Sequence, residues 1–451
     1  MTEKRHIVRL LTLCAALSLT ACSMNMFGAV RQTPGNGMEG TTSTESTASP
    51  VKTLGKAGLP TPKPEAVPVA AVRPAPSPPP VKKGKATPPA AVAQIPPPAP
   101  EINTGKERKQ NSAAHVDFTY RNATLDEDTA WHGEVSVIGW VTVAPQATLT
   151  VEAGTTVRFE PETPAGPGGS GLLVQGRLVA IGNGEQPILF TSRYVTPAAG
   201  DWQGIVLLAS DKKNVMEECR VEGATIGLET LYAQVGLRDM TASACGTGLR
   251  FRDSFVNMAG GGASGCTVGL GLLNSEAEVR DASINGNRQG VTVRGGSLYL
   301  ANTTLYGNEQ AALDADNLKL KITSSSFTVN GIGLKLSGCE GSVSYSRVLS
   351  NREAGMNLTG SRLRVNGNEI TQNSGVGLRI TEGENVVWGN LLSANNGHDL
   401  EYQGHADLPA MGNWWGGVAP ALLSDRIRVS GDGGGRVLYI PILSERPQFG
   451  L

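Results

Sequence analysis

Residues 367–378 read GNEITQNSGVGL, and the asparagine at position 373 recurs along the chain at a nearly fixed interval. Successive spacings of 21, 22, 21, 22 and 22 residues separate Asn287, Asn308, Asn330, Asn351, Asn373 and Asn395. Two further steps of 21 residues toward the N-terminus reach Cys266 and Cys245. A repeat of this length is typical of a solenoid in which each unit forms one coil and packs on its neighbours.

Two apolar positions accompany all members of this series. Three residues earlier lie Ala242, Ala263, Ile284, Leu305, Phe327, Val348, Ile370 and Leu392, and eight residues earlier lie Leu237, Met258, Val279, Leu300, Ile322, Val343, Val365 and Val387. One unit cannot bury these side chains by itself, whereas units stacked about 4.8 Å apart bury them as continuous columns. An α-helical or leucine-rich repeat would need a different apolar spacing or a leucine consensus, and neither occurs.

The asparagines predict a ladder at one corner of the coil. A side-chain amide both donates and accepts hydrogen bonds, so amides stacked at the coil spacing satisfy one another in a buried turn. We therefore expect Cys245, Cys266 and the six asparagines to occupy one structural column. The two cysteines then lie on adjacent coils, where either two thiols or a disulfide fits, although the β-carbons are further apart than a relaxed bridge prefers.

The unit at 367–378 resembles the repeat of right-handed parallel β-helix proteins. Their pectate-lyase-like superfold includes polysaccharide lyases, hydrolases and epimerases and the copper-site accessory protein NosD. Residues 141–151 resemble the first coils of secreted bacterial members, and residues 412–416 (GNWWG) resemble their closing segment. The resemblance implies an all-β chain whose residues 116–405 form a right-handed parallel β-helix solenoid of about 13 coils, with 406–451 as the closing segment or cap. It is specific for the fold and unspecific for function.

The N-terminus has the features of an export signal. A positive segment (4–9) precedes an apolar run (10–19) that is too short to span a bilayer. The run ends in Leu19-Thr20-Ala21-Cys22, which resembles the lipobox of bacterial lipoproteins. This resemblance implies a signal peptide over 1–21, acylation of Cys22 with diacylglycerol and a fatty acid such as palmitate, and anchorage in a membrane. Ser23 in place of aspartate implies sorting to the outer membrane of the cell envelope.

Residues 22–115 predict a disordered tether. They are rich in Pro, Ala and Lys, with PSPPP at 76–80 and IPPPAP at 95–100, and cannot bury enough apolar surface to fold. A spacer that lies through peptidoglycan and a plain soluble linker both fit this composition. The formal net charge of the whole chain is −1, which gives no reason to expect nucleic acid as a partner.

Two outward-facing columns are candidates for ligand binding. Positions nine and seven residues before each ladder member flank a buried position, so strand alternation turns both outward. They include Arg238, Arg280, Tyr299, Lys321, Arg364 and Trp388. Cations suit the carboxylates of an acidic glycan, and ring faces suit its sugars. The competing interpretation is a solvated, charged sheet that keeps rods apart, and Glu278 on the same face weakens the binding hypothesis.

Catalytic and metal-binding patterns are weak. The sequence strings that mark calcium-dependent lyases, pectin hydrolases and mannuronan epimerases do not occur. Asp239 and Asp281 share a column but lie two coils apart, about 10 Å, which exceeds the separation of paired glycosidase carboxylates. The spacing of the acids and histidines within 398–405 is not a strong ligand pattern. We therefore expect no catalytic residue, no cofactor and no metal ligand.

These observations favour a non-catalytic envelope lipoprotein that presents a rigid β-helix for polysaccharide binding or scaffolding. The first alternative is a carbohydrate-active lyase, hydrolase or epimerase with a diverged site. The second is a NosD-like accessory factor, although no set of copper ligands is evident. The sequence specifies neither the ligand nor the oligomeric state.

Overall fold

The computed structural model describes residues 108–110, 115–160, 169–431 and 434–448. These residues belong to one compact unit. The predicted signal peptide (1–21), the lipidation site Cys22 and nearly all of the predicted tether (22–115) lie outside the described residues.

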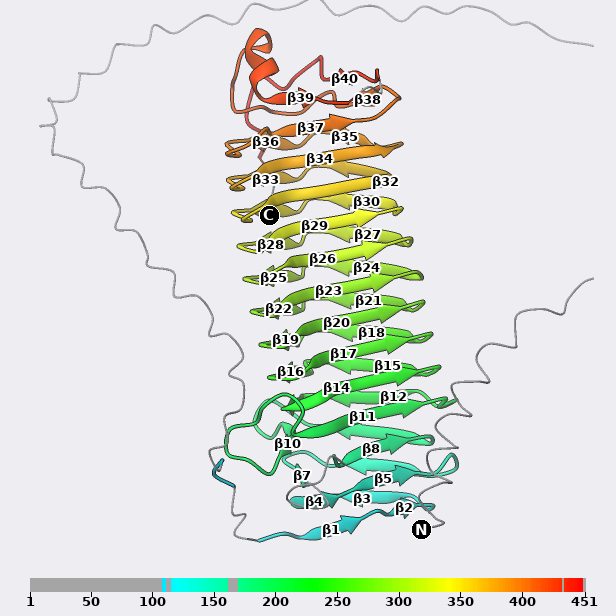
Figure 1. Ribbon diagram of the computed structural model, residues 1–451. Coiled ribbons are helices and arrows are strands. Elements are labelled where there is room, and N and C mark those ends of the chain that lie inside the picture. The colour runs from blue at the N-terminus through cyan, green and yellow to red at the C-terminus, as the bar shows by residue number, and fades with distance from the viewer. Residues whose placement is uncertain (1–107, 111–114, 161–168, 432–433, 449–451) are drawn as a thin grey trace, which may run out of the picture. The chain divides into compact units, whose positions relative to one another are not determined.

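The described chain winds into a stack of coils, and each coil contributes one strand to each of three faces (Figure 1). The first face holds β1 (Phe118–Arg121), β4 (Glu134–Ile138), β7 (Thr156–Glu160), β10 (Ile188–Ser192), β13 (Cys219–Glu222), β16 (Thr241–Ser243), β19 (Gly262–Ser264), β22 (Ser283–Asn285), β25 (Thr304–Tyr306), β28 (Ser326–Thr328), β31 (Arg347–Leu349), β33 (Glu369–Thr371) and β36 (Leu391–Ser393).

The second face follows the first along the chain. It holds β2 (Thr124–Leu125), β5 (Trp140–Val143), β8 (Gly171–Val174), β11 (Trp202–Leu208), β14 (Ala224–Leu231), β17 (Thr247–Arg252), β20 (Val268–Leu273), β23 (Gln289–Arg294), β26 (Ala311–Asp316), β29 (Ile332–Ser337), the first half of β32 (Ala354–Asn366), β34 (Val376–Gly383), β37 (Leu400–Gln403) and β39 (Ile427–Val429).

The third face completes each coil. It holds β3 (Thr129–Trp131), β6 (Thr148–Val151), β9 (Arg177–Ile181), β12 (Asn214–Glu217), β15 (Gln234–Arg238), β18 (Phe255–Ala259), β21 (Glu276–Arg280), β24 (Ser297–Ala301), β27 (Lys319–Thr323), β30 (Glu340–Ser344), the second half of β32 and β35 (Val386–Trp388), with β38 (Leu408–Pro409) and β40 (Val437–Leu438) beyond it.

Neighbouring coils pair in parallel and in register. On the third face, for example, Val279 pairs with Leu300, and Leu300 pairs with Ile322. The first face contains 13 strands, one for each coil. The predicted all-β fold, a parallel β-helix solenoid of about 13 coils, is therefore confirmed.

The core is a set of apolar columns inside the coils. All sixteen side chains at the two predicted apolar positions are buried. Strand alternation produces this result, because every second residue of a strand points into the coil while the residues between them face solvent. Aromatic residues contribute to the core near the N-terminus, where the rings of Phe159 and Trp202 stack with centroids 3.9 Å apart.

The six asparagines form one continuous hydrogen-bonded ladder between the first and second faces. The side-chain Nδ2 of Asn308 donates to Oδ1 of Asn330 at 2.9 Å and to the carbonyl oxygen of Ile284 at 3.1 Å. Its own Oδ1 accepts from both the backbone N–H and Nδ2 of Asn287, each at 3.1 Å. Each interior amide thus satisfies its donors and its acceptor inside the corner.

The ladder begins at the cysteines and ends at a carboxylate. The backbone N–H of Cys266 donates to Oδ1 of Asn287 at 2.9 Å, so Cys266 occupies the preceding step. At the other end, Asn395 donates through its backbone N–H and Nδ2 to Oδ1 of Asp399, at 3.1 and 2.8 Å. A carboxylate can only accept while it is ionised, so the run of amides stops there.

Glycines beside the ladder explain the GVGL part of the repeat. A β-carbon at Gly355 would lie 2.4 Å from the carbonyl oxygen of Gly377 on the next coil. Real β-carbons do not approach so closely, and the coils can pack at this corner only because the position lacks a side chain.

The predicted closing segment continues the stack and also ends it. β39 pairs with β37, and β40 pairs with β38, so this segment adds strands to the last coils. A short 3₁₀ helix, η2 (Pro420–Asp425), precedes β39. Trp415 is 1% exposed and packs within the core cluster at this end. Among the described residues, no helix has the length and apolar character needed to cross a membrane.

At the other end, residues 108–110 are held against the segment that joins β10 and β11. Arg108 forms an ion pair with Asp201, and its guanidinium carbon lies 4.2 Å from the ring centroid of Tyr194. The backbone N–H of Val195 donates to the carbonyl oxygen of Lys109 at 3.1 Å. The chain therefore reaches the first coil after a contact on the flank of the rod.

Candidate functional site

A groove of about 990 Å³ runs over the third face. Its walls are outward side chains of strands β15 to β30, and they include Phe255, Glu276, Tyr299, Lys319 and Lys321. The two outward columns predicted from the repeat meet in this groove. Their register is fixed, since Glu278 pairs with Tyr299 and Tyr299 with Lys321 on successive coils.

Tyr299 is the centre of a cationic cluster in the groove. The guanidinium carbon of Arg280 lies 4.5 Å from the centroid of its ring, and Nζ of Lys321 lies 5.3 Å from it. Nη1 of Arg280 also donates to the Tyr299 hydroxyl at 3.3 Å. Both distances are within the range of cation–π attraction, so the ring holds two positive charges close together.

Charge in the groove is only partly neutralised. Nε of Arg280 donates to the carboxylate of Glu278, and this hydrogen bond raises the pKa of the Arg280 guanidinium. Within the described part of the chain, Lys319 and Lys321 have no acidic side chain at ion-pair distance. The groove therefore contains two cations without an ion-pair partner among the described residues, Lys319 and Lys321, beside Arg280. Its lining also includes the carboxylates of Glu276 and Glu340, of which Glu340 pairs with Arg362.

The structure does not bring all six predicted residues together. Arg280, Tyr299 and Lys321 form the cluster. Arg238 lies two coils away from Arg280 in the same column and forms an ion pair with Glu217. Arg364 is exposed two coils beyond Lys321, with Ser342 between them. Trp388 is 53% exposed on a later coil, outside the groove.

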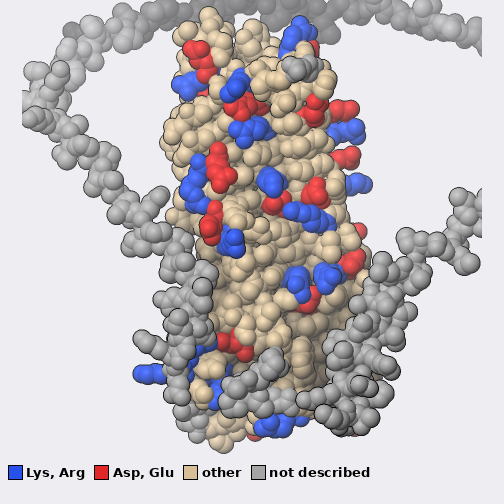
Figure 2. All heavy atoms as spheres, viewed as in Figure 1, with Lys and Arg blue, Asp and Glu red and all other residues tan. Residues whose placement is uncertain are grey.

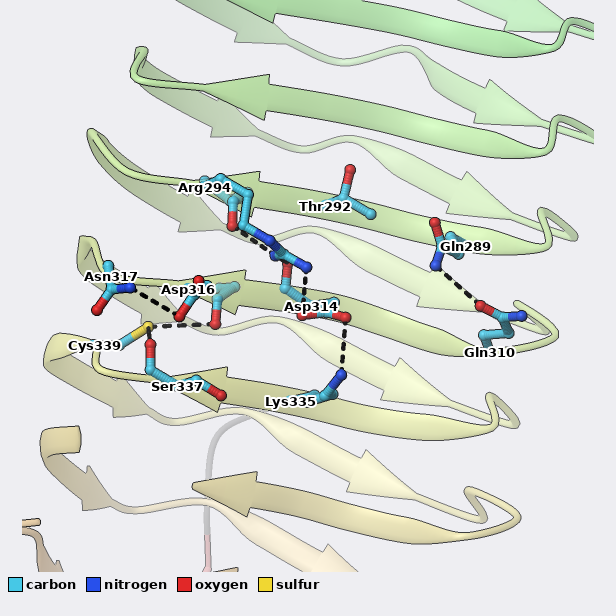
Figure 3. Close-up of polar contacts among 12 residues, drawn as sticks. Gln289, Thr292, Arg294, Gln310, Asp314, Asp316, Asn317, Lys335, Ser337 and Cys339 are labelled. Carbon is cyan, nitrogen blue, oxygen red and sulfur yellow. Dashed lines mark hydrogen bonds and ion pairs between the residues drawn. The ribbon is translucent and has the colours of Figure 1, made fainter. Parts of the chain in front are cut away.

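The second face carries a charged cluster that the sequence analysis missed. Asp314 on β26 forms one ion pair with Arg294 on β23 and another with Lys335 on β29, each with an N–O distance of 3.2 Å; Figure 3 shows both contacts. Similar pairs join Glu229 to Arg250 and Arg379 to Glu401 on other coils. Extending the 21–22-residue period to positions five or six residues after each ladder member would have found this column.

This second-face cluster has the character of a solvated set of ion pairs. Figure 2, viewed as in Figure 1, shows acidic and basic side chains beside one another over this side of the rod. The groove described above does not include any of its residues. Asp314 and Asp316 face outward from one strand, but Asp314 is already bound by two cations, which leaves it poorly suited to accept a proton from a substrate.

Metal and thiol chemistry find no support in the described residues. No group of three or more His, Cys, Asp or Glu side chains has a geometry suited to a metal ion there. Cys219, Cys245, Cys266 and Cys339 are all buried free thiols. Burial raises the pKa of Cys219 to about 12, and the neighbouring Cys266 together with burial raises the pKa of Cys245. Both groups are therefore protonated and unreactive at neutral pH.

Family models agree with the coil architecture over two stretches. Residues 268–413 match the right handed beta helix region, and residues 119–229 match the pectate-lyase like beta helix domain. The chain is a right-handed parallel β-helix repeat protein. No curated protein matches the sequence.

Solved structures that resemble this β-helix protein do so at low identity. The periplasmic alginate epimerase AlgG is 9% identical, with 69% of this chain and 77% of that chain covered and a TM-score of 0.38. The A-module of the Azotobacter vinelandii mannuronan C-5 epimerase AlgE4 is 13% identical, with 66% and 91% covered and a TM-score of 0.41. Tailspike protein 3 of bacteriophage CBA120 is 10% identical, with 70% and 57% covered and a TM-score of 0.25. Similarity at this level carries no information about activity.

Proposed function

We propose that this β-helix protein binds an acidic polysaccharide in the third-face groove and acts as a rigid, non-catalytic binding or scaffolding rod. The observation that carries the proposal is the cluster of Arg280 and Lys321 around the ring of Tyr299, with Lys319 beside it. Cations pair with the carboxylates of a uronic acid, and the aromatic ring offers a face for a sugar.

The arrangement of the cations along the rod supports an extended ligand. Tyr299, Lys321, Ser342 and Arg364 follow one another in one column on consecutive coils. Coils repeat about every 4.8 Å, so Lys321 and Arg364 originate about 10 Å apart. A glycan lying parallel to the rod axis would meet the ring, two cations and a hydroxyl in sequence.

The proposal includes an envelope location. It rests on the resemblance of Leu19–Cys22 to a lipobox, with signal cleavage before Cys22 and acylation of its thiol and new amine. Two or more acyl chains anchor a protein stably, whereas one chain is marginal. The basic, proline-rich residues 22–115 would then separate the outer membrane from the rod.

An enzymatic role is the second candidate, and one observation favours it. Asp314 and Asp316 lie two residues apart on one strand face, about 7 Å by the strand rise. Inverting glycosidases place their carboxyl groups roughly 6.5–9.5 Å apart. Two cations bind Asp314, however, and this pair lies outside the groove, so binding without turnover is the proposal that we retain.

Binding of defined oligosaccharides to the purified full chain tests the proposal. We expect oligomers of a uronic acid to bind and neutral oligomers of equal length to bind at least tenfold more weakly. Lys321→Ala should weaken binding about tenfold, equivalent to about 1.4 kcal/mol. Lys335→Ala is the matched control, because Lys335 occupies the second face and should leave affinity unchanged.

Three results would contradict the proposal. They are equal affinity for neutral and acidic oligomers, an equal loss of affinity in Lys321→Ala and Lys335→Ala, and release of a shortened or unsaturated product. A product that disappears in Asp314→Asn would support the enzymatic candidate instead.

A further inference from the structure

The outward residues of the last three coils of the third face form a compact apolar patch. In one column lie Val386, Pro409 and Leu438, and in the next lie Trp388, Met411 and Ile440. We name these six residues the terminal patch. Five of them are large hydrophobic side chains exposed by 37–65%, while Pro409 is half-buried.

The backbone fixes the alignment of the terminal patch. Trp388, Met411 and Ile440 each precede a residue that is hydrogen-bonded to the next coil. The N–H of Gly389 donates to the carbonyl oxygen of Gly412 at 3.0 Å, and the N–H of Gly412 donates to that of Pro441 at 2.6 Å. Pro409 also pairs with Leu438. The six side chains therefore lie side by side on adjacent coils.

The patch is unlike the rest of the third face. The groove below it is lined by Glu276, Glu278, Arg280, Lys319 and Lys321, whereas the terminal patch contains no charged side chain. Leu422 and Val429, exposed by 58% and 52%, add apolar surface elsewhere on the same closing segment. Contiguous exposed apolar surface that includes a tryptophan marks an interaction site, since water contact with it is unfavourable.

We propose that a second copy of this chain covers the terminal patch in an antiparallel dimer. In this dimer a two-fold axis passes beside Met411, on the middle of the three coils. The axis places β35 of one copy against β40 of the other, so the same apolar patch of each copy covers that of its partner. A glycan fits poorly, because the six side chains carry no charge and only one hydrogen-bond donor, the indole N–H of Trp388. An anionic lipid surface gains little attraction, because the rim cations Arg362 and Arg436 are already paired with Glu384 and Asp407.

The rim of the patch carries both signs, as a protein interface requires. Arg364, one coil below Val386, is exposed, while Arg436 pairs with Asp407 beside β40. The three coils extend only about 14 Å along the rod. The patch is thus smaller than the roughly 800 Å² per partner of a stable complex, so we expect a reversible dimer of micromolar affinity.

Such a dimer leaves both grooves open. The groove ends at β30, and the coil of β32 separates it from the overlapping coils. The inference does not depend on the proposed function. If both hold, each dimer presents two grooves, and a long polysaccharide gains avidity without any new contact.

Sedimentation of the full chain over a wide concentration range tests the inference, with Cys22→Ser introduced so that no lipid is attached. We expect a monomer–dimer equilibrium that Met411→Glu weakens at least tenfold. Tyr306→Ser is the matched control, because Tyr306 is 51% exposed on the first face and should leave the equilibrium unchanged. Met411→Cys should give a disulfide-linked dimer under oxidation, whereas Thr304→Cys should not.

Several outcomes would overturn the inference. A monomer at every concentration would do so, as would a dimer equally strong in Met411→Glu that retains the wild-type circular dichroism spectrum. Flotation of the monomer with zwitterionic vesicles, lost in Met411→Glu, would assign the patch to a lipid surface. Loss of oligosaccharide binding in Met411→Glu would assign it to the glycan.

Discussion

Removal of one interior rung of the asparagine ladder should be far more costly than removal of a surface asparagine on the same coil pair. Asn308 is fully buried and takes part in four hydrogen bonds: two that its Nδ2 donates and two that its Oδ1 accepts. In Asn308→Ala all four are lost. Asn285→Ala is the control, since among the residues that the structure describes its side chain bonds only to Ser283, in an exposed contact.

The magnitude follows from the number of bonds. A hydrogen bond contributes a net of about 1 kcal/mol, so four of them amount to about 4 kcal/mol. The Asn287 N–H and the Ile284 carbonyl lose the Asn308 side chain as a partner, whereas Asn287 Nδ2 still donates to the Ala263 carbonyl and Asn330 Oδ1 still accepts from the backbone N–H of residue 308. Asn285→Ala should change the free energy of unfolding by no more than about 0.5 kcal/mol.

Two measurements together report the effect. Urea unfolding followed by circular dichroism gives the change in the free energy of unfolding. Hydrogen exchange gives a local measure, because stacked coils need not unfold in one step. The Asn287 amide should exchange at least tenfold faster in Asn308→Ala than in the wild type. Equal unfolding free energies for the two variants, or unchanged protection at Asn287, would refute the reasoning.

Three further variants or reactions test other parts of the structure. Burial raises the pKa of Asp399, whose Oδ2 has no hydrogen-bond partner, above its unfolded value of about 3.9, so the stability of the wild type falls as pH rises from the unfolded pKa to the folded pKa. Asp399→Asn should therefore stabilise the fold by about 1 kcal/mol at pH 7 and remove this pH dependence. Unfolding curves recorded over a pH series test this, and a less stable variant at pH 7 would contradict it. Gly355→Ala should destabilise by about 1–3 kcal/mol because its β-carbon meets the Gly377 carbonyl. Gly184→Ala is the control, because a β-carbon at Gly184 has no atom within 4 Å and its backbone is not in the left-handed region; equal melting temperatures for the two variants would count against close coil packing. Because the four thiols are free and buried, iodoacetamide should leave Cys219, Cys245, Cys266 and Cys339 unmodified in the native protein and should alkylate all four in urea. A disulfide-linked peptide pair containing Cys245 and Cys266 in the mass spectrum would contradict the assignment of free thiols.

The repeat made most of the fold predictable. Once Asn308 and Asn330 are one coil apart, the burial of Leu300 and Ile322 and the outward direction of Tyr299 and Lys321 follow from strand alternation alone. Parallel pairing in register then places equivalent positions side by side, and for this reason the sequence alone assigns Arg280, Tyr299 and Lys321 to one region.

Contacts that depend on side-chain conformation or on a break in the period could not be predicted in this way. The pairing of Arg238 with Glu217 depends on how two long side chains extend across neighbouring coils. Asp399 ends the ladder only four residues after Asn395, where the period fails. Trp388 lies in the same column as Arg280, but its neighbours there are Asn366 on one side and Met411 of the closing segment on the other, and no repeat position predicts Met411.

Distances between spin labels along the first face measure the stacking of the coils most directly. One outward column of this face contains Thr241, Thr304, Arg347 and Glu369. Counted from Thr241, the other three residues lie three, five and six coils away, in that order. Labels paired between Thr241→Cys and cysteines at the other three positions, in a chain whose native cysteines are replaced, should be separated by about 14, 24 and 29 Å, a straight line of about 4.8 Å per coil. Distances that do not rise in equal steps with coil number would contradict the stacked-coil account.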